Sequence, residues 1–280
     1  MVEPDPTPEP EVPADSVPPP EPVPSLAVQT DAVLNAILGK LKPPDEQPKY
    51  FKMLIYGPSG HGKTTFMGTA PDNIIIDIED GLASLANHPD FISDSLQVFP
   101  YKSFESLEVV ISKFMEQPEE LKHLKTMSID SVSDLHKRGL AETVERDWKR
   151  SPTLNNRYVA TTEQQMENNE RIRRLVSSLR DLPMNLILTA HDRTIEPKNR
   201  AAKTFPDFSE KLANTIAGIV DVVVYLSIKE IEGKSVRTLR FHSDGNIAAK
   251  TRISGFSEEI INPNWNDIYS IFQKNKKIEE

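Results

Sequence analysis

The stretch that decides the fold is Gly57-Pro58-Ser59-Gly60-His61-Gly62-Lys63-Thr64, which fits the pattern G-x-x-x-x-G-K-[ST] at every fixed position. The apolar run Lys52–Tyr56 before it predicts a strand, and Thr65-Phe66-Met67 after it predicts the start of a helix. Glycines let such a loop curl until successive backbone N–H groups point inward at a phosphate. We expect Lys63 to contact the β- and γ-phosphates and Thr64 to ligate Mg²⁺. Gly57–Thr64 and Thr65 therefore predict a nucleoside triphosphate site, with ATP and Mg²⁺ as its ligands.

The 280-residue chain opens with an acidic, proline-rich segment. Residues 1–24 contain ten prolines and six carboxylates, and no Lys, Arg, Gly or aromatic residue. Because so little apolar surface cannot offset the entropy of ordering, we expect this segment to be disordered. Residues 1–48 carry −7 of the net charge of −9, so the acidity does not exclude a nucleic-acid partner for the rest. The segment is a solubilising spacer, a mimic of nucleic acid or a site for a partner protein.

Two absences in the sequence exclude further classes of protein. The chain has no cysteine, which excludes disulfides and zinc–thiolate sites. No apolar run approaches the ~20 residues of a membrane span, and the N-terminus lacks a basic region followed by an apolar one. We therefore expect a cytoplasmic protein without a membrane partner.

After residue 48, short apolar runs alternate with longer amphipathic ones. The expected strands are Lys52–Tyr56, Asn73–Ile78, Leu96–Phe99, Thr126–Ile129, Asn185–Thr189 and Asp221–Ile228. The expected helices lie near Lys63–Gly68, Phe104–Gln117, Ser133–Trp148, Thr162–Asp181 and Lys211–Gly218. This alternation predicts an α/β fold, a mostly parallel sheet flanked by helices. The short turns after Asp221 predict an antiparallel C-terminal meander that ends with a strand at Ala248–Ile253.

The same pattern predicts the domain organisation. We expect the disordered tail at residues 1–24, an amphipathic helix (Ser25–Leu41) with its linker at 25–48, and a nucleotide-binding core at 49–256. Residues 257–280 then form a C-terminal helix, near Asn264–Lys277, and a tail. The Ser25–Leu41 helix packs either on its own core or on a neighbouring subunit.

Carboxylates follow two of the expected strands, at the sheet edge where open α/β proteins place their ligands. Asp77, Glu79 and Asp80 lie at the carboxyl end of one strand, and Asp130 directly follows another. Glu79 is the candidate base that activates the water attacking the γ-phosphate. Asp130 is the candidate second residue of the Mg²⁺ site, acting through water. The simpler interpretation, loop carboxylates or helix caps, is expected to hold for one or two of the first group.

A third expected strand, Asn185–Thr189, is followed closely by His191. A side chain at this place can contact the γ-phosphate and report its loss to the next loop. His191 can equally be a surface histidine without that role. The other five histidines have no comparable placement and suggest no metal cluster.

Together these motifs resemble the RecA-like P-loop ATPases, and among them the phage nucleotide-binding proteins and single-strand annealing recombinases that are reduced RecA relatives. The resemblance spans about residues 50–256 and rests on five matches in order: Gly57–Thr64, Ile76–Leu82, Ser128–Ser131, Thr189–Asp192 and Ala249–Arg252. It implies that Glu79 is the catalytic base. It also implies that Lys250 and Arg252 reach the γ-phosphate of a neighbouring subunit, where they neutralise transition-state charge.

The chain departs from RecA in two respects. RecA has a glutamine where this chain has His191, and its separate C-terminal domain has no counterpart here. For Lys250 and Arg252, the simpler interpretation is an edge strand with solvated charges.

The resemblance further implies that two loops contact single-stranded DNA, namely Arg146–Arg157, with Trp148 and Tyr158 nearby, and Asp192–Glu210. Cations follow the phosphates while aromatic faces stack on bases, so such loops bind without sequence preference. The alternative is a pair of solvated loops. The residues expected to bind DNA are Lys149, Arg150, Arg157, Arg193, Lys198, Arg200 and Lys203.

We therefore expect a slow, DNA-dependent ATPase that assembles head to tail into a ring or filament. It would bind single-stranded DNA and promote annealing or homologous recombination for a phage, in the cytoplasm of the host cell. A phage or host single-strand-binding protein is a further expected partner. The alternatives are a DNA motor or helicase-like ATPase of phage replication or packaging, and a nucleotide-gated interaction module that never binds DNA.

Overall fold

A computed structural model describes residues 34–35, 38–39, 50–86, 94–196 and 201–277. The chain divides into two compact units, Met1–Gln47 and Pro48–Glu280. In the first unit, Leu34, Asn35 and Leu38 are helical and exposed, within the predicted helix Ser25–Leu41. The predicted disordered tail at residues 1–24 and the rest of that helix and its linker lie outside the described residues.

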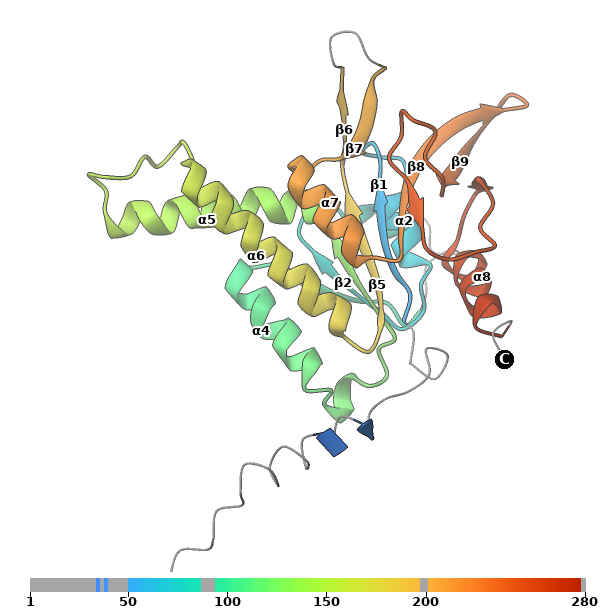
Figure 1. Cartoon of the computed structure of the whole chain (residues 1–280), viewed down its shortest axis with the longest axis horizontal. Helices are drawn as coiled ribbons and strands as arrows, with labels where there is room; N and C mark the ends of the chain where they lie inside the picture. The colour runs from blue at the N-terminus through green and yellow to red at the C-terminus, as the bar shows by residue number, and fades with distance from the viewer. Residues whose placement is uncertain (1–33, 36–37, 40–49, 87–93, 197–200, 278–280) are drawn as a thin grey trace, which may run out of the picture. The chain divides into compact units, whose positions relative to one another are not determined.

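The second unit is built on one nine-stranded sheet (Figure 1) in the order β11-β9-β8-β1-β5-β4-β2-β3, with β10 paired to β8 off that path. Helices cover both faces of this sheet, so its central strands are apolar on both sides. The strands that run parallel to one another are β1 (Lys52–Tyr56), β2 (Asn73–Asp77), β3 (Gln97–Pro100), β4 (Thr126–Asp130), β5 (Asn185–Ala190) and β8 (Val222–Ile231). The carboxyl ends of these strands therefore meet at one edge of the sheet.

Antiparallel strands extend the sheet beyond β8. They are β9 (Lys234–Arg240), β10 (Lys250–Thr251) and β11 (Glu259–Ile261). The β8–β9 hairpin turns at Glu232 and Gly233, whose φ angles of 52° and 71° suit a two-residue turn between twisted strands. The predicted fold class is confirmed: a mostly parallel α/β sheet flanked by helices, with antiparallel strands toward the carboxyl end. The strand predicted at Ala248–Ile253 is shorter and spans only Lys250–Thr251, although the backbone N–H of Arg252 still donates to the Asp221 carbonyl at 3.0 Å.

Two groups of helices bury the two faces of the sheet. One face packs against α4 (Phe104–Met115), α5 (Val132–Arg150), α6 (Thr162–Asp181) and α7 (Glu210–Ile219). The other packs against α2 (Lys63–Gly68), α3 (Ala83–Ala86) and α8 (Trp265–Lys277), while a short 3-10 helix, η3 (Glu119–Leu121), follows α4. The predicted C-terminal helix is thus confirmed as α8, and its Trp265 and Phe272 rings pack on Phe51. None of the helices that the structure describes combines the length and hydrophobicity of a membrane span.

Hydroxyl side chains fix where the longer helices begin. Ser103, Ser131, Thr161 and Ser209 each accept a hydrogen bond from a backbone N–H in the first turn of α4, α5, α6 and α7. Ser131 directly follows Asp130. The cap of α5 therefore holds the final carboxylate of β4 beside the start of that helix.

A two-stranded ribbon projects from the sheet in Figure 1, formed by β6 (Asp192–Ile195) and β7 (Lys203–Pro206). We predicted only a loop over Asp192–Glu210. The ribbon has no buried apolar run that could reveal its strands, and its pairing depends on backbone bonds and on a side-chain bond between Thr194 and Thr204 at 3.0 Å.

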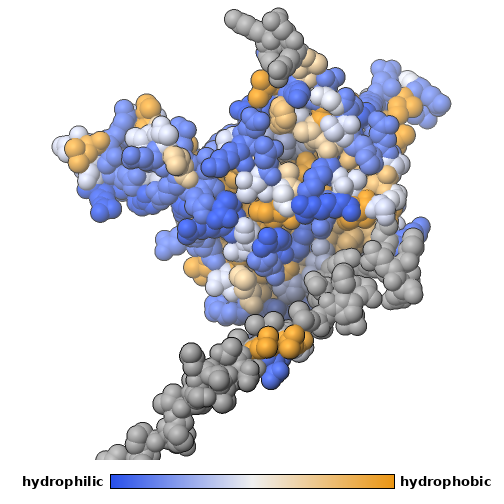
Figure 2. Space-filling view, viewed as in Figure 1, coloured by the Kyte–Doolittle hydropathy of each residue, from blue (hydrophilic) through white to orange (hydrophobic). Residues whose placement is uncertain are grey.

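An arm also projects in Figure 1. It consists of the C-terminal part of α5, the N-terminal part of α6 and the connection between them. The helix α5 continues to Arg150, so Lys149 and Arg150 lie on its last turn and not in the predicted Arg146–Arg157 loop. Leu154 and Val159 are exposed in the connection, where Figure 2 shows hydrophobic atoms. The prediction of a loop here is right only from Ser151 onward.

Candidate active site

The phosphate-binding loop leaves the carboxyl end of β1 and enters α2 in a conformation that requires glycine at two positions. At Gly57, with φ of 156°, an added Cβ atom would lie 2.1 Å from the carbonyl oxygen of Leu226 on β8. At Gly62, with φ of 100°, it would lie 2.5 Å from Nε of Arg237 on β9. The contact at Gly57 is with backbone and excludes a side chain, whereas the one at Gly62 is with the side chain of Arg237, so at Gly62 the positive φ is what favours glycine. Packing against β8 therefore explains the first fixed glycine of the motif, and backbone conformation explains the second.

Lys63 is buried at the start of α2 and only 6% exposed. Its Nζ donates hydrogen bonds to the carbonyl oxygens of Gly57 and Pro58, at 2.7 and 2.9 Å. Burial lowers the pKa of Lys63, whereas the carboxylates of Glu79 and Asp130 raise it. A buried ammonium is stabilised by an anionic acceptor. A triphosphate in the loop would supply one.

Asp130 ends β4 and is 1% exposed. Its two carboxylate oxygens accept hydrogen bonds from the hydroxyls of Thr64 and Thr189, each at 2.7 Å. Burial raises the pKa of Asp130, and the two hydroxyls lower it. Hydroxyl and carboxylate oxygens are the ligands Mg²⁺ prefers, so the donor set of Thr64 and Asp130 fits this ion. Thr189 is a partner that we did not predict from the sequence.

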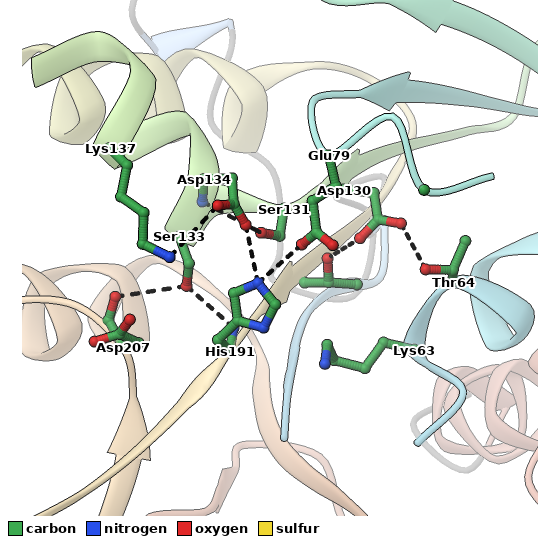
Figure 3. A network of polar contacts seen from close by, with 12 residues as sticks. Lys63, Thr64, Glu79, Asp130, Ser131, Ser133, Asp134, Lys137, His191 and Asp207 are labelled. Carbon is green, nitrogen blue, oxygen red and sulfur yellow. Dashed lines mark hydrogen bonds and ion pairs between the residues drawn. The ribbon is translucent and has the colours of Figure 1, made fainter. Parts of the chain in front are cut away.

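His191 lies between two carboxylates (Figure 3). Its Nε2 is 2.9 Å from Oδ2 of Asp134 and 3.2 Å from Oε1 of Glu79. The contact with Glu79 raises the pKa of His191 against burial, which lowers it, and Asp134 raises it further. Burial alone would raise the pKa of Asp134, but hydrogen bonds, first among them one from Ser131, hold it below its ordinary value. The contacts of the imidazole with both carboxylates therefore place Glu79 beside the start of α5.

The structure brings the main predicted site residues together. Figure 3 shows Lys63, Thr64, Glu79, Asp130 and His191 converging from α2 and from the carboxyl ends of β2, β4 and β5. Oε1 of Glu79 is buried and lies 3.2 Å from Nε2 of His191. This carboxylate retains capacity to bind a water molecule, as its predicted role as base requires.

The two other carboxylates after β2 have local roles. Asp80 pairs with Arg138 at 3.2 Å, and its side chain is 78% exposed. Asp77 accepts a hydrogen bond from the backbone N–H of Gly81 at 3.4 Å, inside the turn that follows β2. The simpler interpretation therefore applies to these two residues.

Hydrogen bonds fix the base of the ribbon on α5. The backbone N–H of His191 donates to Oγ of Ser133 at 3.0 Å, and Oγ of Ser133 contacts the carbonyl of Asp207 at 3.5 Å. The N–H of Asp207 in turn donates to the carbonyl of His191 at 2.8 Å. This cluster could not be predicted from the sequence, because Ser133, His191 and Asp207 are far apart along the chain.

Lys250 and Arg252 lie away from the phosphate-binding loop of their own chain. Lys250 pairs with Val223 near the start of β8, and its Nζ donates to the carbonyls of Ala217 and Val220. Arg252 donates from Nη2 to the carbonyl of Gly218 at 2.7 Å. Both cations thus stabilise the carboxyl end of α7. Their role toward the γ-phosphate of a neighbouring subunit stays a prediction.

Local carboxylates engage several cations of the arm. Arg157 and Lys149 both contact Glu145, at 3.0 and 3.5 Å, and the Arg157 guanidinium lies 4.6 Å from the centre of the Trp148 ring. Arg146 pairs with Asp147 and Glu167. These contacts partly neutralise the positive charge of the arm.

The remaining residues expected to bind DNA lie at the end of α5 and on the ribbon. Arg150, Arg193 and Lys203 are exposed, and Arg193 also donates to the carbonyl of Phe208 at 3.0 Å. Lys198 and Arg200 lie outside the described residues. Binding of DNA by these residues stays a prediction.

Comparison with known proteins identifies the core. Residues 49–253 match the family model of an AAA domain (AAA_24). No curated protein matches the sequence significantly. Similar solved structures include a KaiC-like protein from Pyrococcus horikoshii OT3, with 13% identity over 76% of this chain and 89% of that chain, and a TM-score of 0.42. They also include the flagellar accessory protein FlaH from Methanocaldococcus jannaschii, with 12% identity over 76% and 85% of the two chains and a TM-score of 0.42.

Proposed function

This chain belongs to the AAA domain family, and from that premise we propose that it is a Mg²⁺-dependent ATPase whose turnover responds to single-stranded DNA. Lys63 and the loop amides bind the phosphates, and Thr64 with Asp130 holds the ion. Glu79 activates the attacking water. Mg²⁺, when bound, neutralises charge on the phosphates.

The contact that most directly supports a response to a polymer is the ion pair of His191 with Glu79 at 3.2 Å. His191 is also the residue from which the ribbon starts, because β6 begins at Asp192. A ligand that shifts the ribbon changes how His191 holds Glu79, and thereby changes the orientation of the base. Hydrolysis and ribbon binding are in this way coupled through one side chain.

The ligand of the ribbon is proposed to be single-stranded DNA. Arg193 and Lys203 are exposed near its two ends, with Arg150 at the end of α5 as a further cation. Such cations give binding that depends on salt and not on sequence. The resemblance to RecA-like phage proteins supports annealing or recombination as the outcome, and a phage or host single-strand-binding protein as a partner.

Assembly into a ring or filament completes the proposal. Lys250 and Arg252 lie near the start of β8, at the end of the sheet opposite the phosphate-binding loop, so a phosphate that they contact would belong to another copy. Mixing Lys250→Ala with Lys63→Ala protein should restore part of the ATPase activity, because an intact half of each site can then meet. No recovery would count against this geometry.

The decisive test measures the ATPase rate with and without single-stranded DNA, together with retention of labelled DNA at low salt and sizing by light scattering. We expect stimulation by DNA and retention that requires ATP. Failure to retain DNA would favour a nucleotide-gated interaction module instead. Fast turnover with directional strand displacement would favour a DNA motor.

A further inference from the structure

The ribbon contacts two tyrosines that lie side by side on neighbouring strands of the sheet. Tyr56 is the last residue of β1, directly before Gly57, and Tyr225 is its partner in the register of β8. Their ring centres lie 5.1 Å apart, with an angle of 54° between the ring planes. Figure 1 shows the ribbon projecting from this end of the sheet. The tyrosine pair therefore lies between the phosphate-binding loop and the ribbon.

Tyr56 brings a buried hydroxyl to the ribbon. The residue is 0% exposed, and its hydroxyl oxygen lies 2.7 Å from the carbonyl oxygen of Ala248 and 3.2 Å from that of Thr204 on β7. Burial raises the pKa of Tyr56, so the hydroxyl keeps the proton that it donates. Because a phenol has one proton to donate, it can form a full hydrogen bond with only one of the two carbonyls at a time. The hydroxyl therefore has two discrete arrangements, and the shorter distance favours Ala248.

The two carbonyls near this hydroxyl belong to segments that are bonded to each other. The N–H of Thr204 donates to the carbonyl of Asn246 at 2.6 Å, and the N–H of Ala248 donates to the carbonyl of Thr204 at 3.1 Å. Two residues after Ala248 the chain enters β10 at Lys250. A change in the bonding of Tyr56 therefore acts on the ribbon and on the segment that leads to Lys250.

Tyr225 contacts the other strand of the ribbon. Its hydroxyl oxygen lies 3.4 Å from Oδ2 of Asp192, the first residue of β6. Burial, followed by the charge of Asp192, raises the pKa of Tyr225 to about 12, so this hydroxyl is also a donor. The two tyrosines thus bond to both strands of the ribbon.

On its other side, Tyr56 is joined to the phosphate-binding loop. The N–H of Gly57 donates to the carbonyl of Ala190 at 3.3 Å, and the carbonyl of Gly57 accepts from Nζ of Lys63 at 2.7 Å. A triphosphate competes with this carbonyl for Lys63, because an ammonium bonds more strongly to a charged acceptor. Binding of the phosphates therefore changes the hydrogen bonds of the residue that directly follows Tyr56.

We propose that Tyr56 is a positioning residue that couples binding of phosphates in the loop to the ribbon and to the segment before Lys250, while Tyr225 holds the start of β6. Phosphate binding shifts the Tyr56 hydroxyl between its two carbonyl acceptors. The loop thereby gains a second connection to the ribbon, in addition to the one through Glu79 and His191. The inference rests on the proposed function, because it concerns how the same nucleotide site acts on the ribbon.

Hydrogen–deuterium exchange of the full chain, with and without Mg²⁺ and the non-hydrolysable analogue AMP-PNP, tests this coupling. In the wild type we expect AMP-PNP to change the exchange rates of amides in residues 203–206 and 246–251 by about two- to tenfold, the equivalent of one neutral hydrogen bond. Tyr56→Phe loses only the hydroxyl and should lose most of this change. A purely structural hydroxyl would instead alter exchange equally with and without AMP-PNP, which would overturn the inference.

Tyr101→Phe is the matched control. It removes a hydroxyl that donates to Glu142 on α5 at 2.7 Å, and it should keep the full effect of AMP-PNP on the ribbon. An effect of AMP-PNP in Tyr56→Phe as large as in the wild type would also overturn the inference. Circular dichroism checks that each variant folds. If Tyr56→Phe does not fold, Tyr225→Phe should reduce the effect of AMP-PNP in residues 192–195, and an unchanged effect there would count against the tyrosine pair.

Calorimetric titration of the wild type with AMP-PNP separates this inference from the proposed function. Binding of AMP-PNP without a change of exchange in the ribbon or in residues 246–251 would overturn the coupling and leave the nucleotide site intact. Failure to bind AMP-PNP would overturn the proposed function and the coupling together. None of these measurements requires DNA, so a failure to bind DNA does not affect them.

Discussion

Lys52 and Lys63 are alike in burial and hydrogen bonding. Lys52 begins β1, whereas Lys63 begins α2, after the loop that follows the carboxyl end of β1. Each is 6% exposed, and each donates from Nζ to two backbone carbonyls. Burial lowers the pKa of both, that of Lys52 to about 8. The acceptors of Lys52 are the carbonyls of Leu182 and Met184, which connect α6 to β5. Those of Lys63 belong to the phosphate-binding loop itself.

Burial and hydrogen bonding therefore do not distinguish a structural lysine from one that binds a ligand. The neighbours do. Asp130, Glu79 and His191 gather near Lys63, and His191 contacts Glu79 at 3.2 Å. Near Lys52, the carboxylate of Asp221 instead accepts a hydrogen bond from the backbone N–H of Lys52 at 3.0 Å, and Arg252 bonds to the end of α7, so the charged groups there stabilise the chain itself. At the carboxyl ends of the parallel strands, the side chains are arranged to bind a ligand. At the opposite ends of these strands, Lys52 and Arg252 bond to carbonyls at or just after the ends of α6 and α7.

Replacing each lysine tests the difference between Lys52 and Lys63 most directly. Lys63→Ala should lower kcat/KM for ATP about 1,000-fold, because a donor to the reacting phosphates is lost. Lys52→Met should leave kcat/KM unchanged and lower the free energy of unfolding by about 2–4 kcal/mol, because two buried carbonyls lose their donor. Steady-state ATPase assays and urea unfolding measure the two effects. A folded Lys52→Met protein that no longer binds ATP would show that the two edges are not distinct.

Adjacent carboxylates give the next largest contrast. Glu79→Gln should lower kcat about 100-fold with ATP affinity retained, because the amide cannot accept the proton of the attacking water. Asp80→Asn is the control, since this exposed residue pairs only with Arg138 among the contacts that the structure describes. Single-turnover hydrolysis and nucleotide titration separate the two steps. Unchanged turnover in Glu79→Gln would remove this residue from the role of base.

The pH dependence of stability tests the contacts that His191 makes with Glu79 and Asp134. Because Glu79 and Asp134 raise the pKa of His191, the folded protein binds this proton more tightly than the unfolded chain, where the pKa is about 6.5. The resulting stabilisation is complete below about pH 6.5 and is lost as the pH rises through the folded-state value. His191→Asn should remove this decline.

Urea unfolding of the wild type and His191→Asn from about pH 6 to about pH 8.5 measures the effect. His123→Asn, which removes a histidine bonded to Gln97 on the surface, is the control and should keep the decline. The same slope in all three proteins would mean that His191 does not hold the two carboxylates in solution.

The smallest expected effect concerns Lys149 and Arg157, two cations of the arm that form ion pairs with Glu145. Glu145→Gln releases Arg157 and Lys149, so affinity for single-stranded DNA at low salt should rise about two- to fivefold. The exposed pairs contribute at most about 1 kcal/mol, so stability should change little. Glu163→Gln, an equal change of charge at the start of α6, is the control for filter-binding assays. An equal rise in both variants would indicate a general effect of net charge.

Residue patterns predicted the parts of the fold that depend on residues close together in the sequence. Apolar runs marked the central strands, and the spacing of Gly57, Gly62 and Lys63 marked the loop whose geometry the structure explains. The ribbon was missed because its strands lack a buried face. The contact of His191 with Asp134 joins residues 57 apart, and Arg237 reaches Gly62 from another strand, so no spacing could reveal either. Lys250 and Arg252 fit a motif, but only the structure shows that both side chains donate hydrogen bonds to carbonyls at the carboxyl end of α7.

The hydrogen bond from Trp265 to Thr69 has a consequence for synthesis on the ribosome. It joins residues separated by 196 positions, with the phosphate-binding loop at the early end. At about 5–20 residues per second, the C-terminal partner is made roughly 10–40 s after the loop. Both glycines that shape the loop also pack against β8 and β9, which are made late. The nascent chain therefore carries its best-defined motif for most of translation without the neighbours that give it a fixed form.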